Sequence, residues 1–507
     1  MKLRELVGDF SYRVIKGGLD TEVTSLTCDS RSICPGCLFV CIHGQEHDGH
    51  CYIKEALEGQ AAVLVTERLS DSILSLSSDG MTILLAADTK KALARMSARY
   101  YGEPAKKMTM IGITGTKGKT TTAHMLRSVL EQAGYPCGLI GTNGWEAGDV
   151  CHELTHTTPP AWELHAILQN MYRQGCRYVI MEVSSIGVKE KRTEGIRFSY
   201  GIFTNLFRDH IGGKEHGSFA EYRYWKQQFF AQCDTGIFNR DDPQWSVMAE
   251  KTGDNTVTYG QNNQNSQICA RNSQLYEDAD SLGSSFDMIW SENGVQNSQM
   301  IKVPIPGEGN SSNALGAAAC SLCLGILPHV IAAGIAKTVV KGRAELVCSG
   351  FGVRIWIDYA HNGGSLQQIL TTLRAYHPKR LICLFGCGGC RSRERRYPMG
   401  KVSGSLADMT ILTEDNSREE DPLSIIEEIR RGVEDAKGRY TVILDRTEAI
   451  AWAVEQACAG DWIVLAGKGH EAYQEKNGVR TPFSEHGIVK RLWQKRIQNS
   501  HISYTSK

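Results

Sequence analysis

The residues with the clearest chemistry form a glycine-rich turn between an apolar run and a helical pattern, within segment 111–134. The turn consists of Gly115, Thr116, Lys117, Gly118, Lys119, Thr120 and Thr121. Glycines let successive backbone N–H groups point at one anion, and the following helix N-terminus adds partial positive charge. Lys119 and Thr120 stand where phosphate-binding loops place a lysine and a Mg²⁺-binding hydroxyl, although Ile113 replaces the first glycine. The turn therefore predicts a phosphate site, and a glycine-rich turn without a ligand is the alternative.

Two polar residues follow other apolar runs and could add to this site. Glu182 lies at the end of the run 178–183, and His210 comes soon after the run 201–206. In parallel α/β sheets, ligands bind at the carboxyl ends of the strands. Because a buried carboxylate is costly without a cation, Glu182 indicates Mg²⁺. A lone histidine is more often structural, so the type of His210 alone does not decide its role.

These residues need a scaffold, and the chain alternates apolar and helical patterns in three α/β segments. Residues 1–107 alternate short strands and helices up to a boundary rich in Gly and Pro. Residues 108–340 begin with the strand before the glycine-rich turn. They include an Asn- and Ser-rich stretch at 260–300 that we expect to form surface hairpins or loops. Residues 341–507 alternate strands with helices, which is typical of a doubly wound parallel sheet. We therefore predict an α/β protein with three domains at these boundaries.

Composition disfavours several classes of protein. Lys and Arg together number 56, as do Asp and Glu, so the 507-residue chain has no net charge to favour nucleic acid or an anionic membrane. The longest apolar runs are far shorter than the roughly 18 residues of a membrane span. The charged start lacks an apolar stretch of secretory length. The 17 cysteines are scattered, and several lie in apolar runs, as in proteins of a reducing compartment, so we expect a cytoplasmic protein.

The turn GTKGKTT resembles the ATP loop of the Mur ligases, the ATP-dependent amide-forming enzymes of peptidoglycan precursor synthesis. The likeness extends from about residue 24 to about residue 487 and is closest to the members that add the third amino acid. In that family an N-terminal domain binds the uridine nucleotide, and a central P-loop ATPase domain binds ATP. A Rossmann-like C-terminal domain brings the amino acid. The resemblance implies an ADP-forming ligase of cell wall biogenesis, and hence of cell shape and division, with ATP and Mg²⁺ as cofactors.

The implied reaction has two steps. The terminal carboxylate of UDP-N-acetylmuramoyl-L-alanyl-D-glutamate attacks the γ-phosphate of ATP, and an amino group then attacks the acyl phosphate. Such chemistry requires the protein to position anions and to neutralise charge. The implied partners are this nucleotide dipeptide and a diamino acid. We expect a monomer that binds no nucleic acid.

The resemblance assigns catalytic and metal-binding roles in the central segment. The implied catalytic residues are Lys119, Glu182, His210 and Lys226. The implied metal ligands are Thr120, Glu182, His210 and Lys226. Lys226 matches the lysine that the family carries as a carbamate (N6-carboxylysine), whose oxygens suit a second Mg²⁺. An exposed helical lysine is the alternative for Lys226.

Further residues are implied to bind the two nucleotides. For ATP they are the seven residues of the turn with Asn313, Arg343, Asp358 and His361. For the UDP-N-acetylmuramoyl-dipeptide they are Ser30, Gln45, Glu46, His47, Thr157, Thr158, Ser184, Glu190 and Arg192. Ile186 replaces a usual histidine and Glu190 a usual glutamine, and both departures concern the substrate rather than the metal.

The C-terminal segment has the motifs that concern the amino acid. The implied binding residues, which resemble those of enzymes that add meso-diaminopimelate, are Arg391, Asp415, Asn416, Ser417, Arg418, Gly467 and Glu471. The far carboxylate of diaminopimelate suits a bidentate guanidinium, and Glu471 can take its ammonium. L-Lysine would instead bring a bare ammonium against arginine. Cys390, Ser392 and Ser417 depart from the family pattern, where two aspartates and a proline are usual.

Meso-diaminopimelate is therefore the expected amino acid, and L-lysine or another diamino acid is the alternative. A Mur-type ligase of another pathway is a second alternative. A catalytically inactive nucleotide-binding scaffold would belong to a different class of protein. It would require the loss of a catalytic group, yet all four implied catalytic residues remain.

Overall fold

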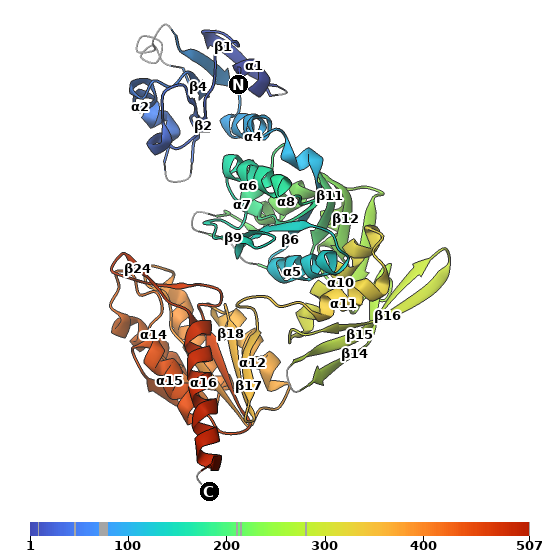
Figure 1. Ribbon diagram of the computed structural model, residues 1–507, viewed down its shortest axis with the longest axis vertical. Helices are drawn as coiled ribbons and strands as arrows, with labels where there is room; N and C mark the ends of the chain where they lie inside the picture. Colours follow the sequence, from blue (N-terminus) through green and yellow to red (C-terminus); the bar gives the residue numbers. More distant parts are fainter. Residues whose placement is uncertain are drawn as a thin grey trace. The chain divides into compact units, whose positions relative to one another are not determined.

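The computed structural model describes residues 1–505 apart from residues 9, 45–46, 70–79, 209–210, 213–214 and 279–280, with side chains up to residue 498. The chain divides into two compact units, and their helices and strands are labelled in Figure 1. The first consists of Met1–Ala270, Ile289–Ser298 and Ser312–Gly334. The second consists of Arg271–Met288, Gln299–Ser311 and Ile335–Lys507. Both units combine parallel sheets with helices, as the sequence predicts.

A five-stranded sheet with the order β1-β5-β4-β3-β2 forms the start of the first unit. Its strands are β1 (Tyr12–Lys16), β2 (Leu26–Thr27), β3 (Leu38–Val40), β4 (Val63–Thr66) and β5 (Thr82–Ala86). Only β1 is antiparallel to its neighbour. Leu38 and Val40 pack into one apolar cluster and Phe39 into another, so both faces of the sheet are covered. The helices are α1 (Leu3–Leu6), η1 (Ser30–Ser32), η2 (Gly49–Tyr52), α2 (Ile53–Glu58), α4 (Thr89–Tyr100) and η3 (Pro104–Lys107).

The central sheet places the predicted phosphate turn at its middle. Strand β6 (Thr109–Thr114) lies between β10 (Tyr178–Glu182) and β11 (Phe198–Phe203), and both pairings are parallel. The neighbouring strands continue in the order β13-β12-β11-β6-β10-β7-β8-β9. The carboxyl ends of β6, β10 and β11 therefore meet at one edge, where ligands of such sheets bind. The other strands are β7 (Cys137–Gly141), β8 (Gly144–Ala147), β9 (Val150–His152), β12 (Cys233–Asn239) and β13 (Thr256–Gly260).

Helices and a polar strand group complete this part of the chain. The helices are α5 (Lys119–Gln132), α6 (Ala161–Arg173), α7 (Ser185–Lys189), α8 (Phe219–Phe230), α9 (Trp245–Ala249), α10 (Glu308–Cys323) and α11 (Pro328–Ala336). The Asn- and Ser-rich stretch forms β14 (Ile268–Glu277), β15 (Leu282–Glu292) and β16 (Val295–Val303). Consecutive residues of β14 and β16 are exposed, in agreement with the expected surface hairpins.

The C-terminal part of the second unit is a six-stranded sheet with the order β17-β18-β22-β19-β20-β21. Every pairing is parallel except that of β17 with β18. The strands are β17 (Glu345–Gly350), β18 (Val353–Asp358), β19 (Arg380–Phe385), β20 (Met409–Leu412), β21 (Tyr440–Val442) and β22 (Asp461–Ala466). A separate hairpin comprises β23 (Tyr473–Lys476) and β24 (Val479–Pro482). The helices are α12 (Gly363–Arg374), η4 (Arg393–Arg395), α13 (Arg396–Leu406), α14 (Pro422–Asp435), α15 (Arg446–Gln456) and α16 (Glu485–Thr505).

Helices cover both faces of this sheet, which makes it doubly wound. Trp356 packs in one apolar cluster with side chains of α12, α13 and α14. Its neighbours Ile355 and Ile357 pack in a second cluster with side chains of α15 and α16. Alternate residues of one strand point to opposite faces, so the two clusters lie on opposite sides of the sheet. Within the part of the chain that the structure describes, no helix has the length and apolarity needed to cross a membrane.

Candidate functional site

The phosphate turn has backbone geometry that requires glycine. Gly118 has a φ of 86°, in the left-handed region, and it directly precedes α5. A Cβ atom at Gly118 would lie 2.2 Å from Oδ1 of Asn313, and one at Gly115 would lie 1.9 Å from Oγ1 of Thr204. Side chains therefore approach the turn too closely for any residue larger than glycine. Asn313, predicted to bind ATP, lies beside the turn as expected.

Residues after β11 hold the turn in place. Oγ1 of Thr204 donates to the carbonyl of Lys117 at 2.7 Å. Oδ1 of Asn205 accepts from the backbone N–H of Lys117 at 2.9 Å. The hydroxyls of Thr116 and Tyr222 lie 3.0 Å apart and are hydrogen-bonded. The turn is thus fixed from β11 and α8 before any ligand binds.

Two lysine ammonium groups share one carbonyl of the turn. Nζ of Lys119 donates to Gly115 O at 2.8 Å and to Thr116 O at 3.1 Å. Nζ of Lys226, from α8, donates to Gly115 O at 2.8 Å. The Lys226 side chain is 2% exposed, so it is not an exposed helical lysine. Both predicted catalytic lysines therefore lie at the phosphate turn.

Glu182 lies at the carboxyl end of β10 and is completely buried. Its carboxylate accepts from the backbone N–H of Thr142 at 3.0 Å and from the Thr142 hydroxyl at 3.1 Å. The Thr142 hydroxyl in turn lies 3.1 Å from that of Thr157. A Cβ at Gly141 would lie 2.2 Å from the carboxylate, so the backbone of β7 approaches it closely. Two hydrogen bonds leave further carboxylate lone pairs available to a cation.

The predicted contacts of the nucleotide dipeptide gather around the carboxyl end of β10. Oγ1 of Thr158 donates to Glu182 O at 3.0 Å and accepts from Ser184 N at 2.9 Å. Nη1 of Arg192 donates to Thr158 O at 2.8 Å. Burial lowers the pKa of the Arg192 guanidinium. The Glu190 carboxylate pairs with Nζ of Lys90 at 2.5 Å and also acts electrostatically on Arg192.

The N-terminal candidates are only partly described. Ser30 opens η1, a short helix capped by the Asp29 carboxylate, which accepts from Arg31 N at 3.0 Å. The carbonyl of His47 accepts from Gly44 N at 2.9 Å. The predicted residues Gln45, Glu46 and His210 lie outside the described residues.

His216 is a buried residue near this site that sequence reasoning missed. Its Nε2 lies 2.9 Å from Oγ of Ser185, at the start of α7. Its Nδ1 lies 3.8 Å from the carboxylate of Glu221, on α8. Burial lowers the pKa of His216. The sequence contained one signal for it, since His216 is the second histidine of the segment that contains His210.

A cavity of about 260 Å³ in the second unit is lined by most of the predicted amino-acid residues. Its lining consists of Tyr359, His361, Gly386, Cys387, Gly388, Arg391, Arg395, Asp415, Asn416, Arg418, Gly467 and Glu471. Three arginines and two acidic residues therefore line one cavity. Nη1 of Arg418 donates to Gly389 O at 2.7 Å, and its Nε lies 3.6 Å from the Glu475 carboxylate. Arg395 is an addition that the motifs did not predict.

Most but not all of the predicted C-terminal residues line this cavity. Ser417 does not, and its buried hydroxyl oxygen has no hydrogen-bond partner within the described structure. Of the ATP candidates in this unit, His361 lines the cavity. The Arg343 guanidinium stacks 5.2 Å from the ring centre of Tyr359. The carboxylate of Asp358 accepts from Ala344 N at 2.7 Å.

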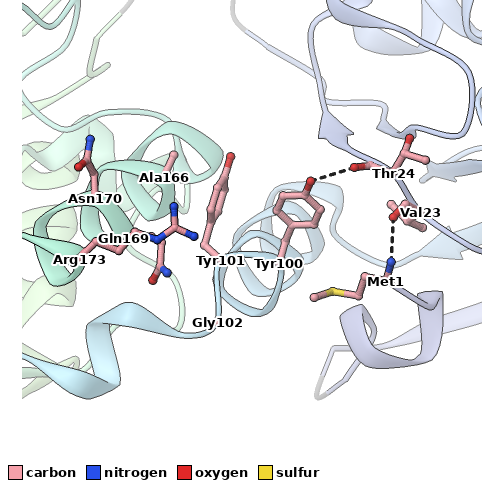
Figure 2. Close-up of a pocket in the computed structure, with 10 residues that line it drawn as sticks. All are labelled: Met1, Val23, Thr24, Tyr100, Tyr101, Gly102, Ala166, Gln169, Asn170 and Arg173. Atoms are coloured by element: carbon pink, nitrogen blue, oxygen red, sulfur yellow. Dashed lines mark hydrogen bonds between the residues drawn. The ribbon is translucent and has the colours of Figure 1, made fainter.

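A larger hollow of about 690 Å³ lies elsewhere in the first unit. Figure 2 shows its lining, which comes from Met1, from the loop residues Val23 and Thr24 before β2, from the end of α4 and from helix α6. The Tyr100 hydroxyl donates to Thr24 O at 3.0 Å at its edge. No predicted site residue lines this hollow.

The side chains near the turn offer oxygen ligands, the kind that Mg²⁺ prefers. Among the described residues, no group of three His, Cys, Asp or Glu side chains could hold a metal on its own. Mg²⁺ is usually held by one or two carboxylates together with substrate phosphates and water. The buried carboxylate of Glu182 and the Thr120 hydroxyl supply oxygen ligands of that kind. The residues therefore fit Mg²⁺ bound together with a triphosphate.

Three family models match successive parts of the chain. The model described as Mur ligase family, catalytic domain, matches residues 22–101. The Mur ligase middle domain matches residues 113–321, and the Mur ligase glutamate ligase domain matches residues 342–469.

Full-length relatives agree with these models. UDP-N-acetylmuramoyl-L-alanyl-D-glutamate–2,6-diaminopimelate ligase of Clostridium perfringens is 37% identical over 96% of this chain and 99% of its own. The protein of the same name from Chlorobaculum tepidum is 38% identical over 92% of both chains. A solved structure of a ligase with this name has a TM-score of 0.69 and 25% identity, covering 98% of this chain and 99% of its own.

The chain therefore belongs to the Mur ligase family. This membership confirms the predicted three-domain α/β fold and the predicted class of enzyme, an ATP-dependent, ADP-forming ligase. The domain boundaries and the roles of single site residues stay predictions.

Proposed function

We propose that this protein adds meso-diaminopimelate to UDP-N-acetylmuramoyl-L-alanyl-D-glutamate in the synthesis of the peptidoglycan precursor. Relatives named for this ligation match nearly the whole chain. The observation that carries the choice of amino acid is the 260 Å³ cavity, where guanidinium groups and carboxyl groups converge. A zwitterionic head group needs both kinds of partner.

The first chemical step uses the phosphate turn. The N–H groups of the turn and the N-terminus of α5 receive the phosphates, and Lys119 neutralises their charge. For this, the Lys119 ammonium exchanges its carbonyl partners Gly115 and Thr116 for phosphate oxygens. Glu182 and Thr120 would hold Mg²⁺, which, when bound, neutralises charge on the transferring phosphoryl group.

In this proposal the acceptor carboxylate of the nucleotide dipeptide binds at the carboxyl end of β10. Thr157, Thr158 and Ser184 offer hydroxyl groups there, and Arg192 offers a guanidinium. Burial weakens the solvation of Arg192, so an arriving carboxylate interacts strongly with it. The carboxylate and the γ-phosphate are then brought together by binding rather than by covalent catalysis.

The second step uses the cavity of the second unit. Arg391 and Arg418 face a ligand carboxylate, while Asp415 and Glu471 face an ammonium. L-Lysine has no carboxylate at its far end, so it would leave one guanidinium without a partner. The charge of the lining therefore favours a diamino acid with two carboxylates.

The test measures phosphate release with the nucleotide dipeptide, ATP and Mg²⁺. Parallel reactions receive meso-diaminopimelate, L-lysine or L-ornithine. We expect release with meso-diaminopimelate to exceed the other two at least tenfold. Equal or faster release with L-lysine would refute the choice of amino acid, and no release with any amine would refute the ligation.

A matched pair of variants tests the cavity itself. Arg418 and Arg480 both lie near the Glu475 carboxylate, at 3.6 and 3.4 Å, but only Arg418 lines the cavity. Arg418→Ala should raise the KM for meso-diaminopimelate by about 10- to 150-fold, the equivalent of one charged hydrogen-bond pair. Arg480→Ala should leave it unchanged. Equal effects of both variants would remove Arg418 from the pocket.

The cytoplasmic location, the monomeric state and carbamylation of Lys226 stay predictions. The buried position of Lys226 at the phosphate turn supports its proposed role as a carbamate near the metal. A carbamate there would place oxygen ligands beside the phosphates.

A further inference from the structure

Lys468 is a buried cation beside the amino-acid cavity that does not line it. It follows β22 in the motif 467–471, and its side chain is completely buried. A buried ammonium is costly unless hydrogen bonds and opposite charges surround it. The contacts of the Lys468 ammonium therefore indicate the role of this residue.

The Lys468 ammonium joins the two predicted amino-acid motifs. Nζ donates to Oδ1 of Asn416 at 2.9 Å and to Tyr473 O at 2.8 Å. It also lies 3.5 Å from the Asp415 carboxylate and 3.8 Å from that of Glu471. Three residues predicted to bind the amino acid thus surround one ammonium group.

This ammonium sets the orientation of the Asn416 side chain. Oδ1 of Asn416 accepts from Lys468 and also from Glu475 N at 3.0 Å. An ammonium can only donate, so the oxygen end of the amide must face it. The NH₂ end then faces Glu471 and donates to its carboxylate at 2.8 Å. Lys468 thereby fixes Glu471 through Asn416.

Glu471 needs such support because its surroundings disfavour ionisation. Burial and the neighbouring Asp415 raise the pKa of Glu471, while Lys468, Asn416 and Arg418 oppose the rise. The side chains of Tyr359 and Tyr473 also face Glu471. A protonated Glu471 carboxyl would lose the negative charge that attracts an ammonium.

We propose that Lys468 is a positioning residue that holds Asn416 and Glu471 ready for an ammonium group of the incoming amino acid. This inference rests on the proposed function. Lys468 acts from behind the cavity wall and does not touch the amino acid. This role explains why a lysine is buried at a position where an apolar residue would give a more stable fold.

The test compares Lys468→Met with Lys476→Met. Met keeps most of the side-chain volume and removes the charge. Lys476 lies in the hairpin of β23 and β24 and is half exposed, and its ammonium pairs with Glu414 at 3.3 Å rather than with Asn416 or Glu471. The readout is kcat/KM for meso-diaminopimelate between pH 5 and 9, with the KM for ATP and for the nucleotide dipeptide measured alongside.

Lys468→Met should raise the KM for meso-diaminopimelate at least tenfold and move the acid limb of its pH profile upward by about one unit. The KM for the two nucleotides should stay within twofold, and Lys476→Met should match the wild type. An unshifted acid limb in Lys468→Met, or an equal rise of all three KM values, would overturn the proposal.

If Lys468→Met does not fold, the pH profile of Lys468→Arg tests the proposal instead, because arginine keeps the positive charge. Its acid limb should stay where the wild type has it, and an upward shift would overturn the proposal. Wild-type turnover with meso-diaminopimelate is measured first. Its absence refutes the proposed function, whereas its presence with an unshifted acid limb in Lys468→Met refutes only the role of Lys468.

Discussion

Substitution of Gly118 by alanine tests how closely the phosphate turn approaches its ligand. Gly118 has a φ of 86° and directly precedes α5. Alanine in this left-handed region costs about 1–2 kcal/mol. The new methyl group would also lie 2.2 Å from Oδ1 of Asn313, far inside van der Waals contact. Either the turn or the Asn313 amide must therefore move by about 1 Å.

The two costs affect different measurements. The backbone cost lowers the free energy of unfolding by about 1–2 kcal/mol. Displacement of the turn removes at least one charged hydrogen bond to phosphate, worth about 1.5–3 kcal/mol, which weakens ATP affinity about 10- to 150-fold. Titration calorimetry with a non-hydrolysable ATP analogue and Mg²⁺ measures the affinity, and urea unfolding measures the stability.

Gly134 supplies the matched control at the other end of the same helix. Its φ is 76°, but a Cβ there would meet no atom within 4 Å. Gly134→Ala should lose similar stability and keep the wild-type affinity for the ATP analogue. The reasoning about the turn is wrong if Gly118→Ala binds the analogue as tightly as Gly134→Ala does.

Three further predictions concern single side chains. Lys226→Ala should be inactive and regain part of its turnover with added short-chain carboxylates, and lack of rescue would count against a carbamate. Ser417→Ala should raise the free energy of unfolding by about 1 kcal/mol in urea, because it removes a buried hydroxyl that has no hydrogen-bond partner within the described structure; a loss would contradict this. Burial lowers the pKa of His165 from 6.5 to about 4, so only the unfolded chain gains a proton between these values. Between pH 7 and pH 5 the free energy of unfolding of the wild type should therefore fall by about 2 kcal/mol more than that of His165→Leu. Equal falls in both proteins would refute the lowered pKa of His165.

Local patterns in the sequence were enough to predict the phosphate turn and the strand ends beside it. The turn lies within seven consecutive residues, and the order of strand, turn and helix fixes its position at the sheet edge. The position of Glu182 at the sheet edge could be predicted because it ends an apolar strand, whereas its role as a metal ligand stays a prediction. The doubly wound sheet followed from regular alternation of strands and helices.

Residues that act across the fold could not be predicted in this way. Arg395 comes from a short helix after β19 and reaches the cavity only because the sheet brings that loop beside residues 415–418. Lys468 stands in a recognised motif, but its contact with Asn416 joins residues 52 positions apart in the sequence. Glu190 pairs with Lys90, a partner 100 positions away that no motif indicates.

The Gly115 carbonyl accepts hydrogen bonds from both Lys119 and Lys226. Any ligand that needs either ammonium group must compete with this carbonyl. A triphosphate must draw the Lys119 ammonium away from this oxygen, so part of its binding energy is used to break an existing contact. A carbamate on Lys226 would be anionic at its oxygens and would be repelled by the same carbonyl. Binding of ATP and carbamylation of Lys226 would therefore each weaken the hydrogen bonds between this one oxygen atom and the two lysines.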